Sequence, residues 1–321
     1  MPAEWEPQSA VQLTWPHEGT DWAPILPEIT AVYEEMAREI RKRESLIIVD
    51  DISHNDTWAR DHGFITVEET SDLSPQTSGL ILLDFKFNGW GEKFPADLDN
   101  QINKQLFDNG LVKGVYEDHL DFVLEGGSIE SDGKGTVFTT ACCLLAPHRN
   151  QPLTAQQIED RLKKYLGAER IVWLHHGSLI GDDTDGHIDT LVRICPDDTL
   201  LYTGGDEAHP DLYEMEHELQ TLRTIEGKPY RLLKLPLPRP IYDTTAISHQ
   251  PSAINRLPAT YANYLVINGA VLVPTYNQPD LDQEAMHVIQ QAFPDREIVG
   301  IDCRAVIKQH GSLHCCTMQY Y

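Results

Sequence analysis

Four side chains of potential catalytic use recur along the chain at nearly one spacing. Glu125 follows Asp61 by 64 residues, His187 follows Glu125 by 62, and Cys315 follows His187 by 128, which is twice 64. A regular interval of this length is the signature of a fold built from repeated units, each of which must stack on its neighbours to bury its apolar face. The chemistry of this chain therefore follows an internal repeat.

Helical periodicity supports the repeat. Apolar side chains between Pro27 and Arg43 fall on one face of a helix, and Thr154 and Gly167 supply an N-cap and a stop signal for another. The expected helices cover residues 27–43, 99–109, 154–166, 211–225 and 280–293. Five helices at roughly even spacing indicate five units.

Short β-type runs complete each unit. A first run follows each helix, at 46–49, 111–116, 170–174, 230–235 and 296–301. We expect a second strand to carry the notable residue and a third, outer strand to close the unit, often after a turn such as Asn268-Gly269. Radial closure leaves only short sheet edges exposed. The prediction is a closed, five-fold pseudo-symmetric α/β body in which the notable residues meet at the axis, with Asn263 and Tyr264 at the equivalent place in unit four.

The sequence favours one domain spanning residues 1–321. No Gly/Ser-rich linker divides the chain, and its 41% hydrophobic content suits a substantial core. No apolar run approaches the roughly 18 residues of a membrane span. The start of the chain lacks the charged and apolar pattern of a secretory signal, and the adjacent pairs Cys142-Cys143 and Cys315-Cys316 suit a reducing compartment. We expect a cytoplasmic protein without a membrane partner.

Charge limits the class of ligand. The formal net charge of −25 argues against nucleic acid, whose binding depends on Lys and Arg. An anionic surface favours cationic ligands through steering, although solubility alone also explains it.

The side chains of the candidate site indicate what kind of cation would bind there. Three carboxylates, Asp61, Glu125 and Asp189, repel one another when they meet without a counter-ion. Guanidinium is planar, permanently charged and rich in N–H donors, so carboxylates can grip it in pairs. Cys315 can then attack its central carbon as a thiolate, and His187 can move protons between the leaving ammonia and the incoming water.

Four motifs in order resemble the agmatine deiminase family: Asn55-Asp56-Thr57-Trp58-Ala59-Arg60-Asp61, Leu124-Glu125-Gly126-Gly127-Ser128, Thr184-Asp185-Gly186-His187-Ile188-Asp189 and Gly311-Ser312-Leu313-His314-Cys315. The opening Met1-Pro2-Ala3-Glu4-Trp5-Glu6-Pro7 is similar too, and the likeness covers almost the whole chain.

The resemblance implies a five-bladed, pentein-like α/β propeller. It implies catalytic Cys315 and His187, with Asp61 and Asp189 gripping the guanidinium and Glu125 orienting His187 or sharing that grip. The implied reaction converts agmatine and water to N-carbamoylputrescine and ammonia through an amidino-thioether on Cys315. No metal or organic cofactor is implied, and the partner is a small cationic guanidino substrate.

Two segments depart from the family pattern. Only Asp50–His54 separates the first strand from the Asn-Asp-x-Trp motif, and Thr244–Asn255 forms a longer loop than usual. Both segments bear on substrate identity more than on chemistry.

Each candidate also has a structural interpretation. Cys315 can be a small buried apolar residue, as we expect of its neighbour Cys316. His187 can be a core histidine, Asp61 can cap a turn, and Glu125 can sit in a bulge.

The aromatic and loop candidates are equally open. Trp58 and Trp90 are core aromatics by default, yet the glycines beside Trp90 suggest a ring that covers a cation. Asp183 can receive a distal ammonium or belong to a solvated turn.

Other functions remain open. Asp185 and Asp189 flank His187 as in a two-manganese ureohydrolase, for which Asp97 and Asp99 are the nearest second cluster. A non-catalytic guanidinium or polyamine binder and a peptidylarginine deiminase are further alternatives. Free arginine requires cations for its carboxylate, and only Arg60 and Arg149 lie near the motifs. Self-association into a homo-oligomer is left open by the sequence.

Overall fold

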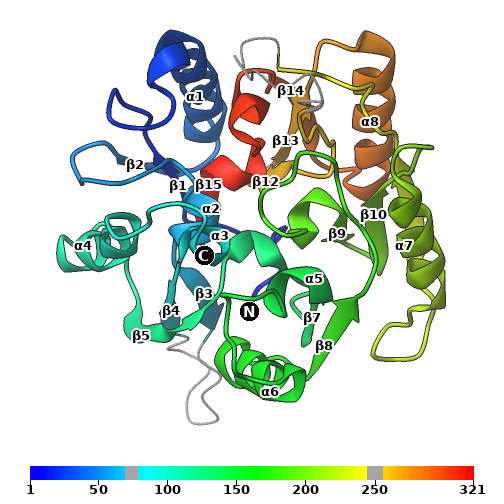
Figure 1. Cartoon of the computed structure of the whole chain (residues 1–321), viewed down its shortest axis with the longest axis horizontal. Helices are drawn as coiled ribbons and strands as arrows, with labels where there is room; N and C mark the ends of the chain where they lie inside the picture. The colour runs from blue at the N-terminus through cyan, green and yellow to red at the C-terminus, as the bar shows by residue number, and fades with distance from the viewer. Residues whose placement is uncertain (69–78, 244–255) are drawn as a thin grey trace.

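The computed structural model describes residues 1–68, 79–243 and 256–321, and in these ranges fifteen strands form five three-stranded sheets. The sheets stand around a common centre, like blades (Figure 1). In order from the inner to the outer strand they are β15-β1-β2 (Thr317–Tyr320, Ala10–Thr14, Ser45–Val49), β3-β4-β5 (Ile65–Glu68, Leu80–Lys86, Val115–Val123), β6-β7-β8 (Ile129–Ser131, Thr136–Thr140, Arg170–Leu174), β9-β10-β11 (Val192–Cys195, Thr199–Thr203, Arg231–Leu235) and β12-β13-β14 (Leu265–Ile267, Ala270–Thr275, Glu297–Asp302). The predicted five-fold pseudo-symmetric α/β propeller is confirmed.

Five longer helices cover the outside of this ring. They are α1 (Leu26–Arg41), α4 (Ile102–Asp108), α6 (Ala155–Leu166), α7 (Pro210–Thr221) and α8 (Pro279–Ala292), so all five predicted helices are confirmed. The expected signals at α6 are present: Thr154 and Gln157 form a capping box, and Gly167 ends the helix in a left-handed conformation. Shorter helical turns are η1 (Ala23–Ile25), α2 (Ala59–His62), α3 (Gly89–Glu92), η2 (Asp99–Gln101), η3 (Gly126–Ser128), α5 (Ala141–Leu144), η4 (Ile188–Thr190), η5 (Val306–Gln309) and η6 (His314–Cys316).

The predicted assignment of strands to units was wrong in one respect. Each sheet pairs its inner and middle strands antiparallel, and a helix then leads to the outer strand, which is parallel to the middle one. The strand after each helix is therefore the outer one, and the strand expected to close the unit is central. Sequence order hides this because a parallel crossover pairs strands that a helix separates. The Asn268-Gly269 turn does join β12 to β13 as predicted.

The four notable residues were expected on strands, and this was also wrong. Each lies at or beside a single helical turn that precedes an inner strand, in α2, η3, η4 or η6. In each turn a backbone N–H bonds back to the carbonyl three residues earlier, for example Ser128 to Glu125 at 3.1 Å and Cys316 to Leu313 at 3.2 Å. The turn bends the chain at the axis, so these side chains face the centre of the ring.

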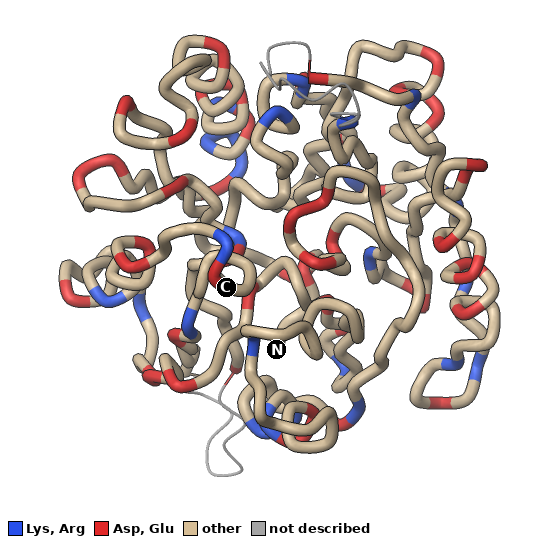
Figure 2. Tube along the Cα trace, in the orientation of Figure 1, with Lys and Arg blue, Asp and Glu red and all other residues tan. Residues whose placement is uncertain are grey.

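Burial follows the radial order. All residues of the inner strands β6, β9, β12 and β15 are buried, whereas outer strands such as β2 and β14 are largely half-exposed. Figure 2 shows charged residues along the outer helices, where α7 carries several acidic positions. In the described residues no helix has the length and apolar character needed to cross a membrane.

Of the two departing segments, only one can be described. The short stretch before the Asn55 motif is held in place by His54, whose ring nitrogens bond the carbonyl oxygens of Ile52 at 2.7 Å and Trp15 at 2.9 Å. The predicted long loop Thr244–Asn255 lies outside the described residues.

Candidate active site

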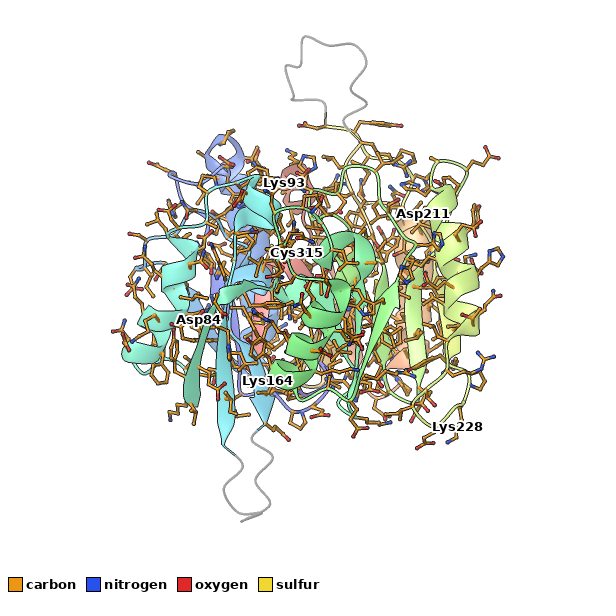
Figure 3. The ribbon with its side chains drawn as sticks, turned by 60° about the horizontal axis from the view of Figure 1, so that its bottom comes forward. Asp84, Lys93, Lys164, Asp211, Lys228 and Cys315 are labelled. Carbon is orange, nitrogen blue, oxygen red and sulfur yellow. The ribbon has the colours of Figure 1, made fainter. Side chains whose placement is uncertain are left out.

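A cavity of about 220 Å³ opens near the centre of the ring. Cys315 lies well inside the molecule, beneath the segment that carries Lys93 (Figure 3). The cavity is lined by Asp21, Asp56, Trp58, Asp61, Trp90, Phe94, Asp183, Thr184, Gln309, His310, Gly311 and Cys315. Four of these residues are acidic and none is Lys or Arg, so the lining favours a cation.

The backbone of Gly127 marks where the predicted groups converge. A Cβ atom added there would lie 2.6 Å from His187 Nδ1, 2.9 Å from Asp61 Oδ1 and 3.1 Å from Asp189 Oδ2. Only glycine leaves room for three side chains to approach so closely. We call Asp61, Glu125, His187 and Asp189 the floor of the site; their exposed fractions run from 0% to 3%, and of the four only Asp61 belongs to the cavity lining.

Asp61 is fixed from two sides. Trp90 Nε1 donates to its Oδ2 at 2.9 Å, and the Gly127 N–H donates to its Oδ1 at 3.1 Å. Burial, with the neighbouring charges of Asp189 and Glu125, nevertheless raises the pKa of Asp61 well above its usual value. A cation that entered the site would reverse this effect by attracting the charged form.

Asp189 behaves in the opposite way. Burial alone would raise its pKa, but a 2.7 Å hydrogen bond from His314 Nδ1 to Oδ2, together with the charge of His314, lowers it. Its other oxygen, Oδ1, is buried without a hydrogen-bond partner in the described part of the chain. The floor thus holds one carboxylate whose charged form His314 favours and one whose charged form is opposed by burial and by neighbouring carboxylates.

Glu125 is held by a buried arginine. Arg149 Nε donates to Glu125 Oε1 at 2.8 Å, while its NH1 donates to Asp185 at 2.9 Å. Burial outweighs Arg149 and raises the pKa of Glu125, and Oε2 has no partner among the described residues. Asp185 also accepts a hydrogen bond from Lys93 at 2.7 Å, so this row of charges reaches the surface.

His187 has a neutral ring whose two nitrogens are not engaged by the described part of the protein. Its side chain is fully buried, and Nδ1 lies 3.6 Å from Asp61 Oδ1. Neither ring nitrogen forms a hydrogen bond within the described residues. Burial lowers the pKa of His187 to about 3, although Asp189 opposes this shift.

Cys315 is oriented by Asn263, the residue at the equivalent position in unit four. Asn263 Oδ1 accepts from the backbone N–H of His314 at 3.0 Å and of Cys315 at 3.3 Å, and lies 3.4 Å from Cys315 Sγ. Burial, followed by the charges of Asp189 and Asp61, raises the pKa of the Cys315 thiol well above its usual value. The thiol is therefore protonated in the empty site.

The tryptophan candidates both line the cavity. The rings of Trp58 and Trp90 meet edge to face, with centroids 6.4 Å apart. Gly311 passes so close to Trp58 that an added Cβ would lie 2.2 Å from its ring.

Asp183 lies at the cavity entrance with Asp21, Gln309 and His310, a group that we call the rim. The side chains of Asp183 and His310 are 43% and 40% exposed. Sequence reasoning missed Asp56, Asp21 and His310, which are cavity-lining residues outside the predicted set. Asp56 stands in the same motif as Trp58, and this position was the available signal.

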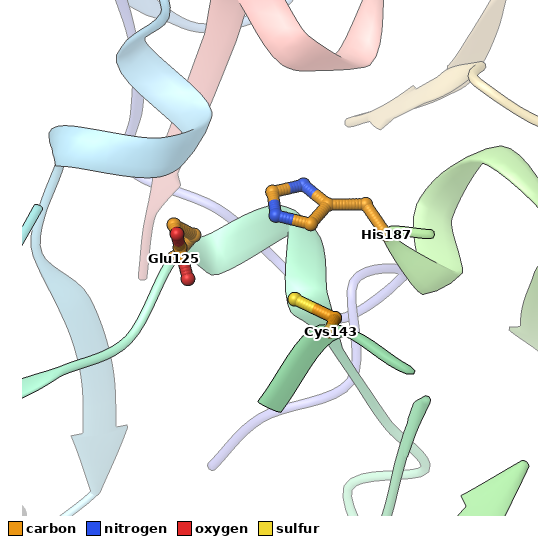
Figure 4. A group of neighbouring side chains, drawn as sticks. All are labelled: Glu125, Cys143 and His187. Atoms are coloured by element: carbon orange, nitrogen blue, oxygen red, sulfur yellow. The ribbon is translucent and has the colours of Figure 1, made fainter. Parts of the chain in front are cut away.

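One cluster near the centre has side chains of the kinds that bind metal ions. Glu125, Cys143 and His187 offer ligand atoms within 4.8 Å of one another (Figure 4). However, the Arg149 guanidinium bonds Glu125 and lies 4.0 Å from Cys143 Sγ, where it opposes a second cation. The charge already present in this cluster therefore does not suit a divalent metal.

The second proposed manganese cluster fits no better. Asp99 Oδ1 accepts the backbone N–H groups of Asn55 at 2.6 Å and Asp56 at 3.2 Å, which is a structural role. Asp185 and Asp189 are engaged by Arg149 and His314, respectively.

Comparisons with known proteins agree with this geometry. The sequence profile of the Porphyromonas-type peptidyl-arginine deiminase family matches residues 1–320. An agmatine deiminase of Medicago truncatula is 32% identical over 359 aligned positions, which cover 99% of this chain and 95% of the relative. A substrate-bound structure of C. jejuni agmatine deiminase is 35% identical with a TM-score of 0.88, covering 100% of this chain and 95% of that one.

A second solved structure is a Porphyromonas gingivalis protein provisionally named an arginine deiminase. It is 47% identical with a TM-score of 0.89, and the match covers 100% of this chain and 97% of that one. A dimethylarginine dimethylaminohydrolase shares the fold alone, with a TM-score of 0.54 at 12% identity.

The ring of five mixed sheets with a buried acidic centre is thus the α/β propeller of the guanidino-modifying proteins. The chain belongs to the Porphyromonas-type peptidyl-arginine deiminase family, and its resemblance to agmatine deiminases is confirmed. The catalytic and binding roles of the site residues stay predictions.

Proposed function

We propose that this protein is an agmatine deiminase, which hydrolyses the guanidinium of agmatine to N-carbamoylputrescine and ammonia. The observation that carries the proposal is the acidic cavity with Cys315 and Asp61 in its lining. Full-length similarity to proteins named agmatine deiminase supports the same activity.

The cavity lining supports a decarboxylated substrate. The carboxylate of free arginine would face four aspartates without a lysine or arginine among the lining residues. Agmatine carries an ammonium at that end instead, which the acidic rim attracts. The long-range field of a chain with formal net charge −25 acts in the same direction.

In the first half-reaction the substrate cation activates the site. Guanidinium N–H groups donate to Asp61 and to the unpartnered Oδ1 of Asp189, and the positive charge favours the charged forms of Asp61 and Cys315. The Cys315 thiol passes its proton to His187, and Sγ bonds to the central guanidinium carbon. His187 returns the proton to the departing amino group, so ammonia leaves and an amidino-thioether remains.

In the second half-reaction water replaces sulfur. His187 takes a proton from water as its oxygen adds to the same carbon. The carbon–sulfur bond breaks, and the water oxygen becomes the carbonyl oxygen of N-carbamoylputrescine. One proton of the water returns to Sγ, and the other is released and taken up by the ammonia that left in the first half-reaction. Glu125, one carboxylate oxygen of which lies within 4.8 Å of a His187 ring nitrogen, attracts the protonated ring in both half-reactions.

Product analysis tests the proposal. Purified protein is incubated with agmatine, arginine or a peptidylarginine in the presence of EDTA, and ammonia, urea and the carbamoyl product are assayed. We expect ammonia with N-carbamoylputrescine from agmatine. Urea formation restored by manganese would instead support a ureohydrolase, and turnover of arginine or peptide alone would reassign the substrate. Tight agmatine binding without product would indicate a binder.

A further inference from the structure

His314, the neighbour of the proposed nucleophile, bridges two buried carboxylates. Its Nδ1 lies 2.7 Å from Asp189 Oδ2, and its Nε2 lies 3.0 Å from Glu4 Oε2. His314 is 1% exposed, and Asp189 is fully buried. The bridge thus joins the floor of the site to the start of the chain, 310 residues away in sequence.

Glu4 is itself rigidly held. Its Oε1 accepts the backbone N–H of Val266 at 2.8 Å, and its Oε2 also accepts from Arg193 NH2. Arg193 is 1% exposed, donates through NH1 to Ala262 O at 2.9 Å, and stacks on Tyr264 with 4.3 Å between its guanidinium carbon and the ring centroid. These contacts leave the Glu4 carboxylate little freedom to turn away from His314.

Contact with Arg193 keeps this end of the bridge charged. Burial opposes ionisation of Glu4, but Arg193 and then His314 outweigh it and lower the Glu4 pKa. An ionised Glu4 fixes the orientation of the imidazole, because the ring must present Nδ1–H to Asp189 while Nε2 stays against the Glu4–Arg193 pair.

His314 does not reach the substrate directly. His314 and Asp189 are both absent from the lining of the cavity that contains Cys315, but Asp189 stands beside Gly127 with Asp61 and His187, whereas the ring nitrogens of His314 face Asp189 and Glu4. His314 also borders a second, smaller cavity of about 40 Å³, together with Glu4, Arg60 and Glu130. Any effect of His314 on the reaction must therefore pass through Asp189.

We propose that His314, held by Glu4, is a positioning residue that fixes Asp189 through its Oδ2 and so aims the free Oδ1 at the substrate guanidinium. This inference rests on the proposed function. It explains why the pKa of Asp189 is lowered whereas that of Asp61, almost as deeply buried, is raised. It also means that Glu4, near the start of the chain, affects substrate binding through His314 and without touching the substrate.

The charge on Asp189 depends on several facing groups. His314 and Arg193 favour the ionised form, as does His187 when protonated, whereas Asp61 and the Cys315 thiolate oppose it. Without His314, burial and the acidic neighbours dominate and raise the pKa of Asp189. The pair Asp61 and Asp189 then loses its charge at a higher pH, and the pair rather than either residue titrates.

The test compares His314→Ala with His314→Asn on the agmatine reaction. The asparagine Nδ2 can replace the imidazole Nδ1 as donor to Asp189, whereas alanine leaves that oxygen unpaired. We expect the alanine variant to raise KM for agmatine by about tenfold or more, the equivalent of one charged hydrogen bond. The acid limb of its kcat/KM profile should move to higher pH, and the asparagine variant should recover both properties in large part.

Two further variants separate the bridge from general damage. Glu4→Gln should move the acid limb in the same direction but less far, and it keeps the test decisive if the alanine variant does not fold. Glu130→Gln is the matched control, since Glu130 bonds Arg193 Nε and, in the described residues, has no hydrogen bond with His314. It should keep the acid limb of the wild type.

The outcomes distinguish the two levels of inference. If the wild-type protein fails to convert agmatine, the proposed function falls and this inference falls with it. If the wild type converts agmatine and His314→Ala, or Glu4→Gln in its place, keeps the wild-type KM and acid limb, only the positioning role is overturned. A shift of equal size in Glu130→Gln would also overturn it, because the effect would then reflect damage to the network as a whole.

Discussion

The floor of the site and the rim of the cavity both contain aspartates, but the two groups differ greatly in exposure to solvent. Asp61 and Asp189 are 3% and 0% exposed, whereas the Asp183 side chain is 43% exposed. Water and salt screen a charge at the rim, while a charge on the floor interacts through a poorly screening interior. From this difference we expect the floor to determine whether a guanidinium binds and reacts, and the rim mainly to attract it.

The largest effect should come from removing the proposed nucleophile. Cys315→Ala should lower kcat for agmatine by more than about 10³-fold, because the remaining groups bind substrate but cannot form the thioether. Cys316→Ala is the matched control: Cys316 is fully buried in the apolar core. Its loss should cost about 1 kcal/mol of unfolding free energy with little change in kcat. Similar kcat losses in both variants would contradict the assignment.

Next in size is the effect of a floor carboxylate. Asp61→Asn should reduce kcat/KM by about 10²-fold or more, since a charged hydrogen bond contributes about 1.5–3 kcal/mol and the neutral amide provides none of that charge. Asp84→Asn is the control. Asp84 is 1% exposed but lies on β4, bonded to Asn103 and Tyr116, away from Cys315 (Figure 3). It should alter stability while kcat/KM stays near that of the wild type.

The floor histidine should also leave a mark on stability. The pKa of His187 is about 3 in the folded protein and about 6.5 in an unfolded chain, so between these values only the unfolded state gains the proton. The unfolding free energy should therefore fall as the pH drops below about 6.5, by at most about 1.4 kcal/mol per pH unit from this residue.

Urea unfolding of the substrate-free protein at several pH values measures this contribution. His187→Gln removes the titrating group, and its stability should fall less steeply with decreasing pH. Parallel curves for the variant and the wild type would show that the His187 ring is not held neutral by burial.

The smallest effect should come from the rim. Asp183→Asn should raise KM for agmatine about two- to threefold, because exposed ion pairs contribute about 0.2–1 kcal/mol, and the difference should shrink at high salt. Asp211→Asn removes an equivalent charge from α7, outside the cavity lining and apart from Cys315 (Figure 3), and should leave KM unchanged. A tenfold rise for Asp183→Asn would make the rim a binding site as specific as the floor.

Local patterns in the sequence predicted much of the fold. The five helices, the Thr154 cap and the Asn268-Gly269 turn are encoded by neighbouring residues, and the interval between Asp61, Glu125, His187 and Cys315 revealed the ring. Sheet membership was not predictable, because the parallel pairing of middle and outer strands is a long-range contact that no local pattern records.

The site was predictable to the same extent. The spacing identified Asp61 and His187, two of the three groups that converge at Gly127, and the break in unit four pointed to Asn263 and Tyr264, of which Asn263 bonds the Cys315 backbone. The bridge from Asp189 through His314 to Glu4 could not be predicted, since it joins segments at opposite ends of the chain that share no periodic relation.

Closure of the ring has a kinetic consequence. In four sheets all strands come from one stretch of chain, but the first sheet pairs β1 with β15, for example Ala10 with Tyr320. Such a distant pairing carries the largest loop-closure entropy in the molecule, so we expect this sheet to form last. Cys315 stands directly before β15 and enters the floor in the same event. Until then the Cys315 thiol is not surrounded by the buried carboxylates. In the folding chain the proposed nucleophile is therefore separated from the charged groups that act on it.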